Sequence, residues 1–181
     1  YLNNKSLESL INIDDKSLEI LNKNNPAIIL TAHIGNWELI IPFMNFLNLK
    51  FAILFKNTKN KSFNKFLTWQ RNYKNILQIS EENSSWKIIN AINKNYNIGI
   101  ANDQRINKNG SKIIFFNQQH SISKTAANIH LKTKRPILLC FCIRKKNQYV
   151  IEIEKINLFK LSNDKEQNIK SINQIYVDKL K

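Results

Sequence analysis

Residues 27–38 read AIILTAHIGNWE, and this stretch decides the fold that we expect for the whole chain. Its first part, residues 27–32, is short and almost wholly apolar, which is typical of a strand buried on both faces of a sheet. Residues 33–35 then predict a sharp turn, because their glycine adopts backbone conformations closed to other residues. We expect a helix from 36 to 47, which Pro42 can kink. The segment therefore predicts one strand–turn–helix unit of an α/β domain.

The same alternation continues in both directions along the 181 residues. We expect strands at 51–55, 76–79, 97–101, 112–116, 136–143 and 149–153, the last as an edge strand. Helices are expected at 14–24, 62–73, from 84 or 85 to about 96, at 123–133, and after a capping box formed by Asn163 and Glu166. This order predicts a single α/β domain, residues 1–181, with a mostly parallel or mixed sheet covered by helices.

The composition bounds the partners and the compartment. A formal net charge of +15 attracts polyanions such as nucleic acid, anionic lipid headgroups or an acidic carrier protein. The charge is spread along the chain, and no dense basic run is typical of a nucleic-acid arm. Cys140 and Cys142 share one face of a strand without the geometry of a disulfide, which favours a reducing compartment. No apolar run reaches the roughly 18 residues that span a bilayer.

The segment's most reactive side chains are those of His33 and Glu38. Five positions apart on one continuous helix, the two would lie about 140° apart and could not pair. With His33 in the turn and Glu38 in the first helical turn, the imidazole can fold back to the carboxylate, which would fix its tautomer and stabilise the imidazolium. The spacing excludes a zincin, and no GxSxG is present. We therefore expect a histidine general base acting on a substrate hydroxyl, with no metal and no cofactor.

The stretch TAHIGNWEL at 31–39 resembles the signature of the late acyltransferases of lipid A biosynthesis, H-x-G-N-W-E. The wider glycerolipid acyltransferases share H-x-x-x-x-D. Weaker matches follow in the same order: Phe55-Lys56, Arg71, Gly99 to Gln104, Phe115-Phe116, Thr125 to Ala127 and Arg135 to Ile137. The resemblance covers roughly residues 25–153, with the final helix also in register. Two residues depart from the family pattern. Lys56 stands where the family has arginine, so the positive charge is kept but the bidentate geometry of a guanidinium is lost. Asn117 stands where the family has glycine, and because Asn tolerates a positive φ a turn can still form there.

The resemblance implies a glycerolipid-acyltransferase-like fold and a role for each matching residue. His33 and Glu38 would be the catalytic pair, and the substrate would be bound by Gly35, Asn36, Lys56, Arg71, Asp103, Gln104, Phe115 and Phe116. Lys56 and Arg71 could hold phosphate or sugar acid groups. Asp103-Gln104 would close the site at a second strand end, and Phe115 and Phe116 would line an acyl pocket or pack in the core. His120 and His130 belong to no such pattern, and we interpret them as surface or core residues.

The implied reaction is transfer of an acyl chain from an acyl carrier protein thioester to the hydroxyl of a 3-hydroxyacyl chain on a lipid A precursor. It would take place at the cytoplasmic face of the bacterial inner membrane. Two alternatives stay open: an acyltransferase that acts on glycerol phosphate or another membrane glycolipid, and a non-catalytic basic domain that binds nucleic acid. The second has only the charge in its favour, and we do not expect nucleic acid as a partner.

The resemblance further implies that the chain is a fragment, because the family's N-terminal membrane helix and a C-terminal segment rich in Trp and Arg have no counterpart in it. The apolar run 39–49, LIIPFMNFLNL, directly follows the catalytic turn. It would be buried in the core or would dip into an anionic membrane surface beside His33.

Overall fold

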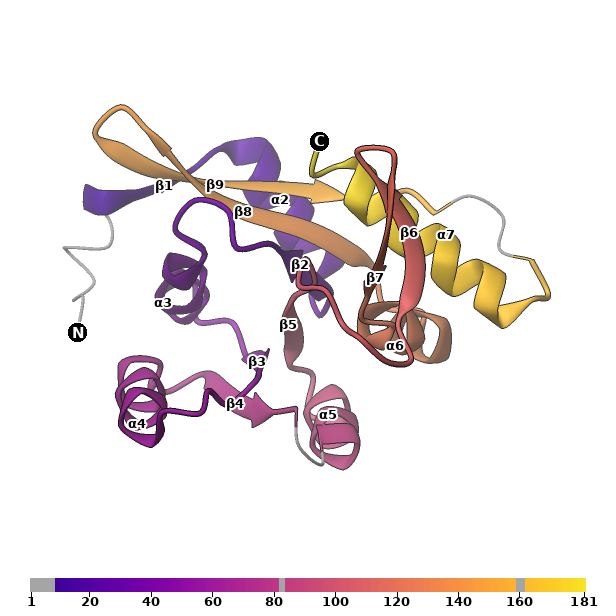
Figure 1. Ribbon diagram of the computed structural model, residues 1–181. Helices are drawn as coiled ribbons and strands as arrows, with labels where there is room; N and C mark the ends of the chain where they lie inside the picture. Colours follow the sequence, from indigo (N-terminus) through magenta and orange to yellow (C-terminus); the bar gives the residue numbers. More distant parts are fainter. Residues whose placement is uncertain (1–8, 82–83, 159–161) are drawn as a thin grey trace.

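A computed structural model describes residues 9–81, 84–158 and 162–181 of the chain (Figure 1). Its strands are β1 (Ile11–Ile13), β2 (Ile28–Thr31), β3 (Phe51–Phe55), β4 (Ile76–Ser80), β5 (Asn97–Ala101), β6 (Ser111–Phe115), β7 (Gln118–Ile122), β8 (Ile137–Lys145) and β9 (Gln148–Lys155). Its helices are α2 (Asp15–Asn24), a 3-10 turn η1 (Trp37–Leu39), α3 (Ile40–Phe46), α4 (Lys61–Gln70), α5 (Ser84–Asn93), α6 (Thr125–Thr133) and α7 (Lys165–Asp178). The predicted α/β domain with a mixed sheet is confirmed.

The main sheet has the strand order β1-β9-β8-β2-β5-β3-β4. Strand β2 lies near its centre and pairs in parallel with β5 on one side and β8 on the other. Strands β3 and β4 continue the parallel run beyond β5. The chain therefore leaves β2, β3 and β5 at the same edge of the sheet, where ligand sites of open α/β sheets lie.

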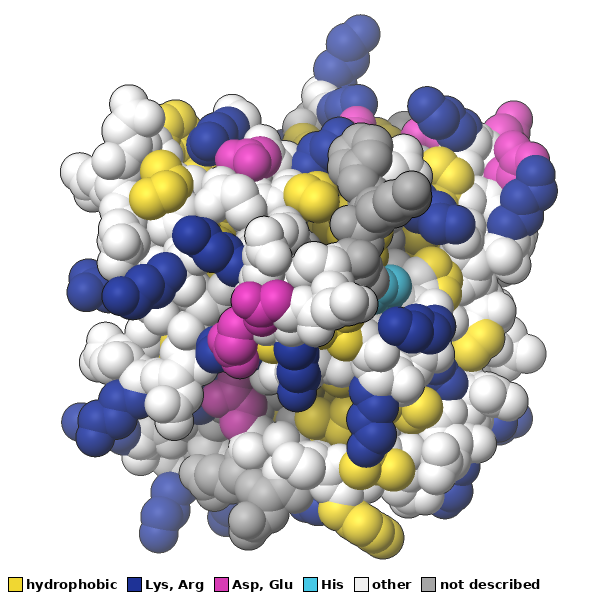
Figure 2. All heavy atoms as spheres, turned by 90° about the vertical axis from the view of Figure 1, so that its right-hand side faces the viewer, with side chains coloured by type: hydrophobic (Ala, Val, Ile, Leu, Met, Phe, Trp, Pro, Cys, Tyr) yellow, Lys and Arg dark blue, Asp and Glu magenta, His cyan; other side chains and the backbone are white. Residues whose placement is uncertain are grey.

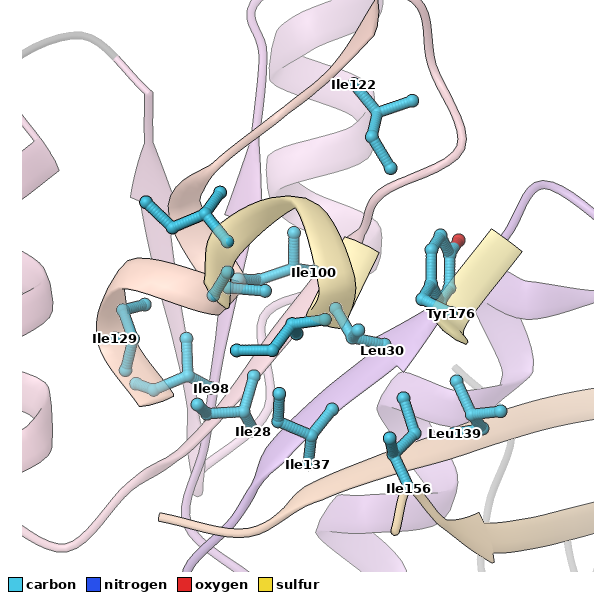
Figure 3. Close-up of a cluster of buried hydrophobic side chains, with 14 of the residues drawn as sticks. Ile28, Leu30, Ile98, Ile100, Ile122, Ile129, Ile137, Leu139, Ile156 and Tyr176 are labelled. Carbon is cyan, nitrogen blue, oxygen red and sulfur yellow. The ribbon is translucent and has the colours of Figure 1, made fainter. Parts of the chain in front are cut away.

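Helices cover both faces of this sheet and enclose two cores. Figure 1 shows α3 and α4 on one side of the central strands, with α5, α6 and α7 on the other. The core under α5 to α7 contains isoleucines from β2 and β5 together with Leu30, Ile137 and Tyr176 (Figure 3). The second core, under α2 and α3, includes Leu21, Met44 and Cys140. Central strands buried on both faces explain the continuous apolar runs of the sequence.

The sheet's outer parts differ from the expected arrangement. Strand β9 was predicted as an edge, but it pairs antiparallel with β8 and parallel with β1, which takes the edge instead. Three residues of β1 are too few to give a sequence pattern. The strand predicted at 112–116 is β6, and it forms a separate hairpin with β7 outside the main sheet. Gly110 precedes this hairpin. Helix α7 is capped by Asp164, whose carboxylate accepts hydrogen bonds from two backbone amides, rather than by Asn163.

The apolar run 39–49 belongs to the core. Five consecutive side chains from Ile40 to Met44 are buried, so of the two expected places for this run the core is the one that the fold gives to residues 40–44. Pro42 does not kink a long helix, because α3 begins at Ile40 and the missing amide proton falls in its first turn, where helical donors lack partners. Helix α4, by contrast, was expected to be amphipathic and buries none of its residues. None of the helices in the described ranges is long and apolar enough to cross a bilayer.

Candidate active site

The turn after β2 is held against the neighbouring strand β8. Gly35 has a φ of +65° and forms an isolated bridge with Cys142, whose carbonyl oxygen accepts a hydrogen bond of 2.9 Å from the Asn36 amide. A Cβ atom on Gly35 would lie 2.2 Å from that same oxygen. Any other residue would therefore both strain the backbone and force the two strands apart. The turn projects the side chain of His33 at the carboxyl edge of the sheet.

His33 is oriented by a residue that lies 70 positions away in the sequence. Its Nδ1 lies 2.8 Å from Oδ1 of Asp103, and its backbone amide donates to Oδ2 of the same carboxylate at 3.0 Å. Because a carboxylate accepts, Nδ1 carries the proton and Nε2 keeps its lone pair. The Nε2 atom faces the amide nitrogen of Gln104 at 3.4 Å. Strands β2 and β5 are neighbours, which brings the residues after their ends together.

Glu38 has a different partner from the one predicted. Both of its carboxylate oxygens accept hydrogen bonds from Arg71, one of them from Nε at 3.0 Å. Arg71 is a buried residue that follows α4, so its guanidinium must be neutralised inside the protein. A planar guanidinium meets two carboxylate oxygens at once, which an imidazole cannot do. The expected contact of Glu38 with His33 is thus replaced by this ion pair, and Arg71 turns its fork inward rather than to a phosphate.

Two aromatic rings surround the ion pair. The guanidinium of Arg71 lies 5.6 Å from the ring centroid of Trp37 and 5.9 Å from that of Phe55. Trp37 also meets the imidazole of His33 edge-on, with ring centroids 4.8 Å apart. Trp37 is therefore the one side chain that these contacts place against both the histidine and the ion pair.

A pocket of about 430 Å³ opens beside the histidine. Its apolar lining residues include Ile29, Ile40, Ile41, Phe51, Ile53 and Ile100, with Gly99 among them, and its polar ones include His33, Glu38, Lys56, Thr58, Arg71 and Gln104. Gly99 keeps its floor open, because a Cβ there would lie 2.3 Å from the ring of Phe51. A largely apolar cavity of this size with a few polar groups suits a hydrocarbon chain with a reactive end.

The remaining residues that were predicted to bind substrate lie in different places relative to the pocket beside His33. Lys56 is exposed on the rim, directly after β3. Asn36 lines a second cavity of about 320 Å³ beyond Glu38 and Arg71, which border both. Phe115 and Phe116 lie at the tip of the β6–β7 hairpin, where their rings contact each other, and are not among the pocket-lining residues in the described part of the chain. Of the two predicted places, Phe115 has the one in the core, against which it packs, whereas Phe116 is exposed.

A support under the site was missed by the sequence reasoning. The hydroxyl of Tyr176 in α7 donates to the carbonyl oxygen of Thr31 at 2.8 Å, at the end of β2. Burial, together with the nearby charge of Asp103, raises the pKa of this tyrosine, so it stays a neutral donor. Only the helical spacing of Tyr176 was visible in the sequence, and that spacing predicted core packing.

Thiol chemistry is excluded by burial. Cys140 and Cys142 in β8 are fully buried free thiols, and burial raises the pKa of Cys142 to about 11 and that of Cys140 further. The thiolate is the nucleophilic form, and it is scarce at neutral pH under these conditions. The two thiols are therefore poor candidates for the nucleophile of an acyl transfer.

Comparison with known families agrees with this geometry. The model of the bacterial lipid A biosynthesis acyltransferases matches residues 3–180, nearly the whole chain. The chain belongs to this family. No match was found among curated proteins.

Membership of the lipid A acyltransferases settles the class of the protein. It is an acyltransferase of lipid A biosynthesis, so the alternative of a non-catalytic basic domain is contradicted. The resemblance stated from TAHIGNWEL is confirmed, and the match extends beyond residues 25–153 at both ends. As an acyltransferase, the protein needs a site for an acyl donor and one for a lipid acceptor, and the largely apolar pocket beside His33 is a candidate for one of them.

Proposed function

We propose that the protein transfers a fatty acyl chain from an acyl carrier protein thioester to a hydroxyl of a lipid A precursor, with His33 as the general base. The proposal depends on one observation: His33 lines a largely apolar pocket while the Asp103 carboxylate lies against its Nδ1, which favours the tautomer whose Nε2 can accept a proton. A base placed at the open end of a hydrocarbon pocket is what an acyl transfer to a hydroxyl needs.

The reaction can be written with these residues alone. Nε2 of His33 removes the proton of the acceptor hydroxyl as its oxygen attacks the thioester carbonyl carbon. The tetrahedral intermediate then collapses, the C–S bond breaks, and the imidazolium returns the proton to the departing thiolate. Asp103 keeps the imidazole in the required tautomer and stabilises the imidazolium between the two steps. An ester and a free thiol are formed, and His33 is regenerated.

Glu38 has a supporting part in this scheme. Its ion pair with Arg71 forms part of the pocket wall, and Trp37 connects that wall to the imidazole. Glu38 and Arg71 are thus positioning residues, while Lys56 on the rim is the cation that contacts an anionic group of the acceptor. We expect Lys56→Arg to keep activity on a phosphorylated lipid precursor and Lys56→Glu to lose it. Equal rates for both variants would remove Lys56 from the site.

The test of the function uses the full-length protein and a purified acyl carrier protein thioester. Mass spectrometry follows addition of the acyl chain to a lipid A precursor, to glycerol phosphate and to an unrelated membrane glycolipid, side by side. We expect only the lipid A precursor to gain mass, and His33→Ala to lower turnover by about 100-fold to 10,000-fold. His120→Ala, on β7 and outside the pocket, is the matched control and should retain turnover. Near wild-type turnover of His33→Ala would contradict the assignment of the base.

We propose the cytoplasmic face of the bacterial inner membrane as the place of action. The support is the pair of free, buried thiols, which is typical of proteins in reducing compartments, together with the lipid acceptor. Protease treatment of spheroplasts carrying the tagged full-length protein tests this. We expect protection until the membrane is opened, and digestion in intact spheroplasts would place the protein on the opposite face.

A further inference from the structure

Helix α4 carries an exposed aromatic ridge, formed by Phe63, Phe66 and Trp69. The three side chains recur every third residue and are 47%, 52% and 55% exposed. Their rings contact in sequence, with centroids 6.4 Å and 6.1 Å apart. A helix of a water-exposed domain normally turns such a stripe to the core, and α4 turns it outward.

The sequence segment that contains the ridge is basic, and the acidic residues nearest to it in sequence, Glu38 and Glu81, line the adjoining pocket. Between Glu38 and Glu81 the sequence contains no acidic residue, whereas Lys50, Lys56, Lys59, Lys61, Lys65, Arg71 and Lys74 fall in that interval. Lys59, Lys61 and Lys65 are exposed on or directly before α4. The face drawn in Figure 2, over α5 to α7, is also rich in Lys and Arg, but acidic side chains are interspersed there.

The ridge borders the candidate active site. Phe63 and Leu67 of α4 line the pocket that contains His33, and Phe66 and Trp69 line the second cavity behind Glu38 and Arg71. A molecule or membrane that contacts the exposed face of α4 would therefore lie beside the pocket that contains His33. Aromatic side chains with lysines around them are the composition of a helix that lies in the interface of an anionic bilayer.

We propose that α4 lies in the headgroup region of an anionic bilayer, with Phe63, Phe66 and Trp69 in contact with acyl chains and the lysines in contact with headgroups. This proposal rests on the proposed function in one respect. If the acceptor is a lipid, a membrane-bound α4 explains how the acceptor reaches His33 without leaving the membrane. It takes the place of the run 39–49, whose residues 39–44 are buried, as the membrane-contacting segment. An acidic carrier protein would match the lysines but would not need the ridge.

The first experiment measures binding of the protein to vesicles of phosphatidylglycerol and phosphatidylcholine. Phe66→Ser/Trp69→Ser should lower the partition coefficient of the chain at least about 10-fold, as expected for two aromatic side chains withdrawn from an apolar phase. Each of Lys59→Gln, Lys61→Gln and Lys65→Gln should lower it about 5-fold at low salt.

The matched control lies on α5, on the other side of the sheet. Trp86 and Ile89 are 71% and 44% exposed, so Trp86→Ser/Ile89→Ser removes a similar exposed apolar pair and should leave binding unchanged. Circular dichroism confirms that each variant is folded. Loss of binding in the α5 variant with none in the α4 variant would overturn the proposal.

The second experiment locates the contact directly. The chain has three tryptophans, so Trp37→Phe/Trp86→Phe leaves Trp69 alone and Trp37→Phe/Trp69→Phe leaves Trp86 alone. Lipids brominated on their acyl chains should quench the fluorescence of Trp69 and not that of Trp86. The reverse result, or quenching of neither, would overturn the proposal.

These measurements are separate from turnover. His33→Ala should still bind vesicles and show quenching, so failure of the proposed reaction and failure of the membrane surface are distinguishable. If the α4 variant binds vesicles normally but raises KM for the acyl carrier protein thioester with a detergent-dispersed acceptor, α4 is the docking site of the carrier. That outcome would also overturn the membrane assignment.

Discussion

Two carboxylates flank the histidine turn, and they do different things. Asp103, 70 residues away in sequence, hydrogen-bonds both the ring and the backbone of His33. Glu38, five residues away, neutralises the buried Arg71 instead. The difference shows that neighbouring strand ends, rather than short sequence spacing, decide which acid meets the base. The comparison can be tested by changing each member of the two pairs in turn.

Asp103→Asn should have the largest effect on turnover. The variant loses the charge that stabilises the imidazolium and lets the ring adopt the wrong tautomer, so we expect kcat to fall at least about 100-fold with KM little changed. Steady-state kinetics on the full-length enzyme, with both substrates varied, measure this split. If Glu38→Gln lowers kcat more than Asp103→Asn in equally stable proteins, the roles of the two carboxylates are reversed.

Glu38→Gln should act mainly on stability. It leaves the guanidinium of Arg71 buried without its counter-charge, and we expect a loss of about 2–3 kcal/mol in the free energy of unfolding. Urea denaturation measures it, and the double variant Glu38→Gln/Arg71→Met should recover part of the loss because no charge then remains buried. A double variant as unstable as the sum of its two single variants would show that the ion pair is not coupled.

The strands around the turn could be predicted from the sequence, because an apolar run reflects burial of the strand itself and Gly35 reflects the positive φ of the turn. Strands β2, β3, β5 and β8 fall within one or two residues of their expected bounds. The pairing of His33 with Asp103 depends on β2 lying beside β5, and the periodicity of apolar residues does not predict the order of strands in a sheet. Glu38 pairs with Arg71 because the guanidinium is buried. The sequence shows only a helical pattern followed by an arginine, and this does not reveal whether that arginine is buried. The exposed face of α4 likewise has the spacing of a buried one.

Gly35→Ala tests the turn that separates the two carboxylates. Its positive φ and the close carbonyl oxygen of Cys142 should together cost about 1–3 kcal/mol in the free energy of unfolding. Thermal and urea denaturation measure the loss. Gly35→Ala with unchanged stability and turnover would mean that β8 does not hold the turn.

Trp37→Phe should have the smallest effect, and it concerns the residue that touches both pairs. The shorter ring keeps an aromatic face toward Arg71 but loses part of its contact with the imidazole. We expect turnover to fall about 3-fold, as befits the loss of a fraction of one aromatic contact, since Asp103 still orients His33. Trp37→Leu removes both contacts and should lower stability by about 1 kcal/mol more than Trp37→Phe does. In the Asp103→Asn background, Trp37→Phe should have a larger effect on kcat than in the wild type, because the ring edge is then the main restraint left on the imidazole. Equal effects in both backgrounds would show that Trp37 supports the ion pair alone and that the two carboxylate pairs act independently.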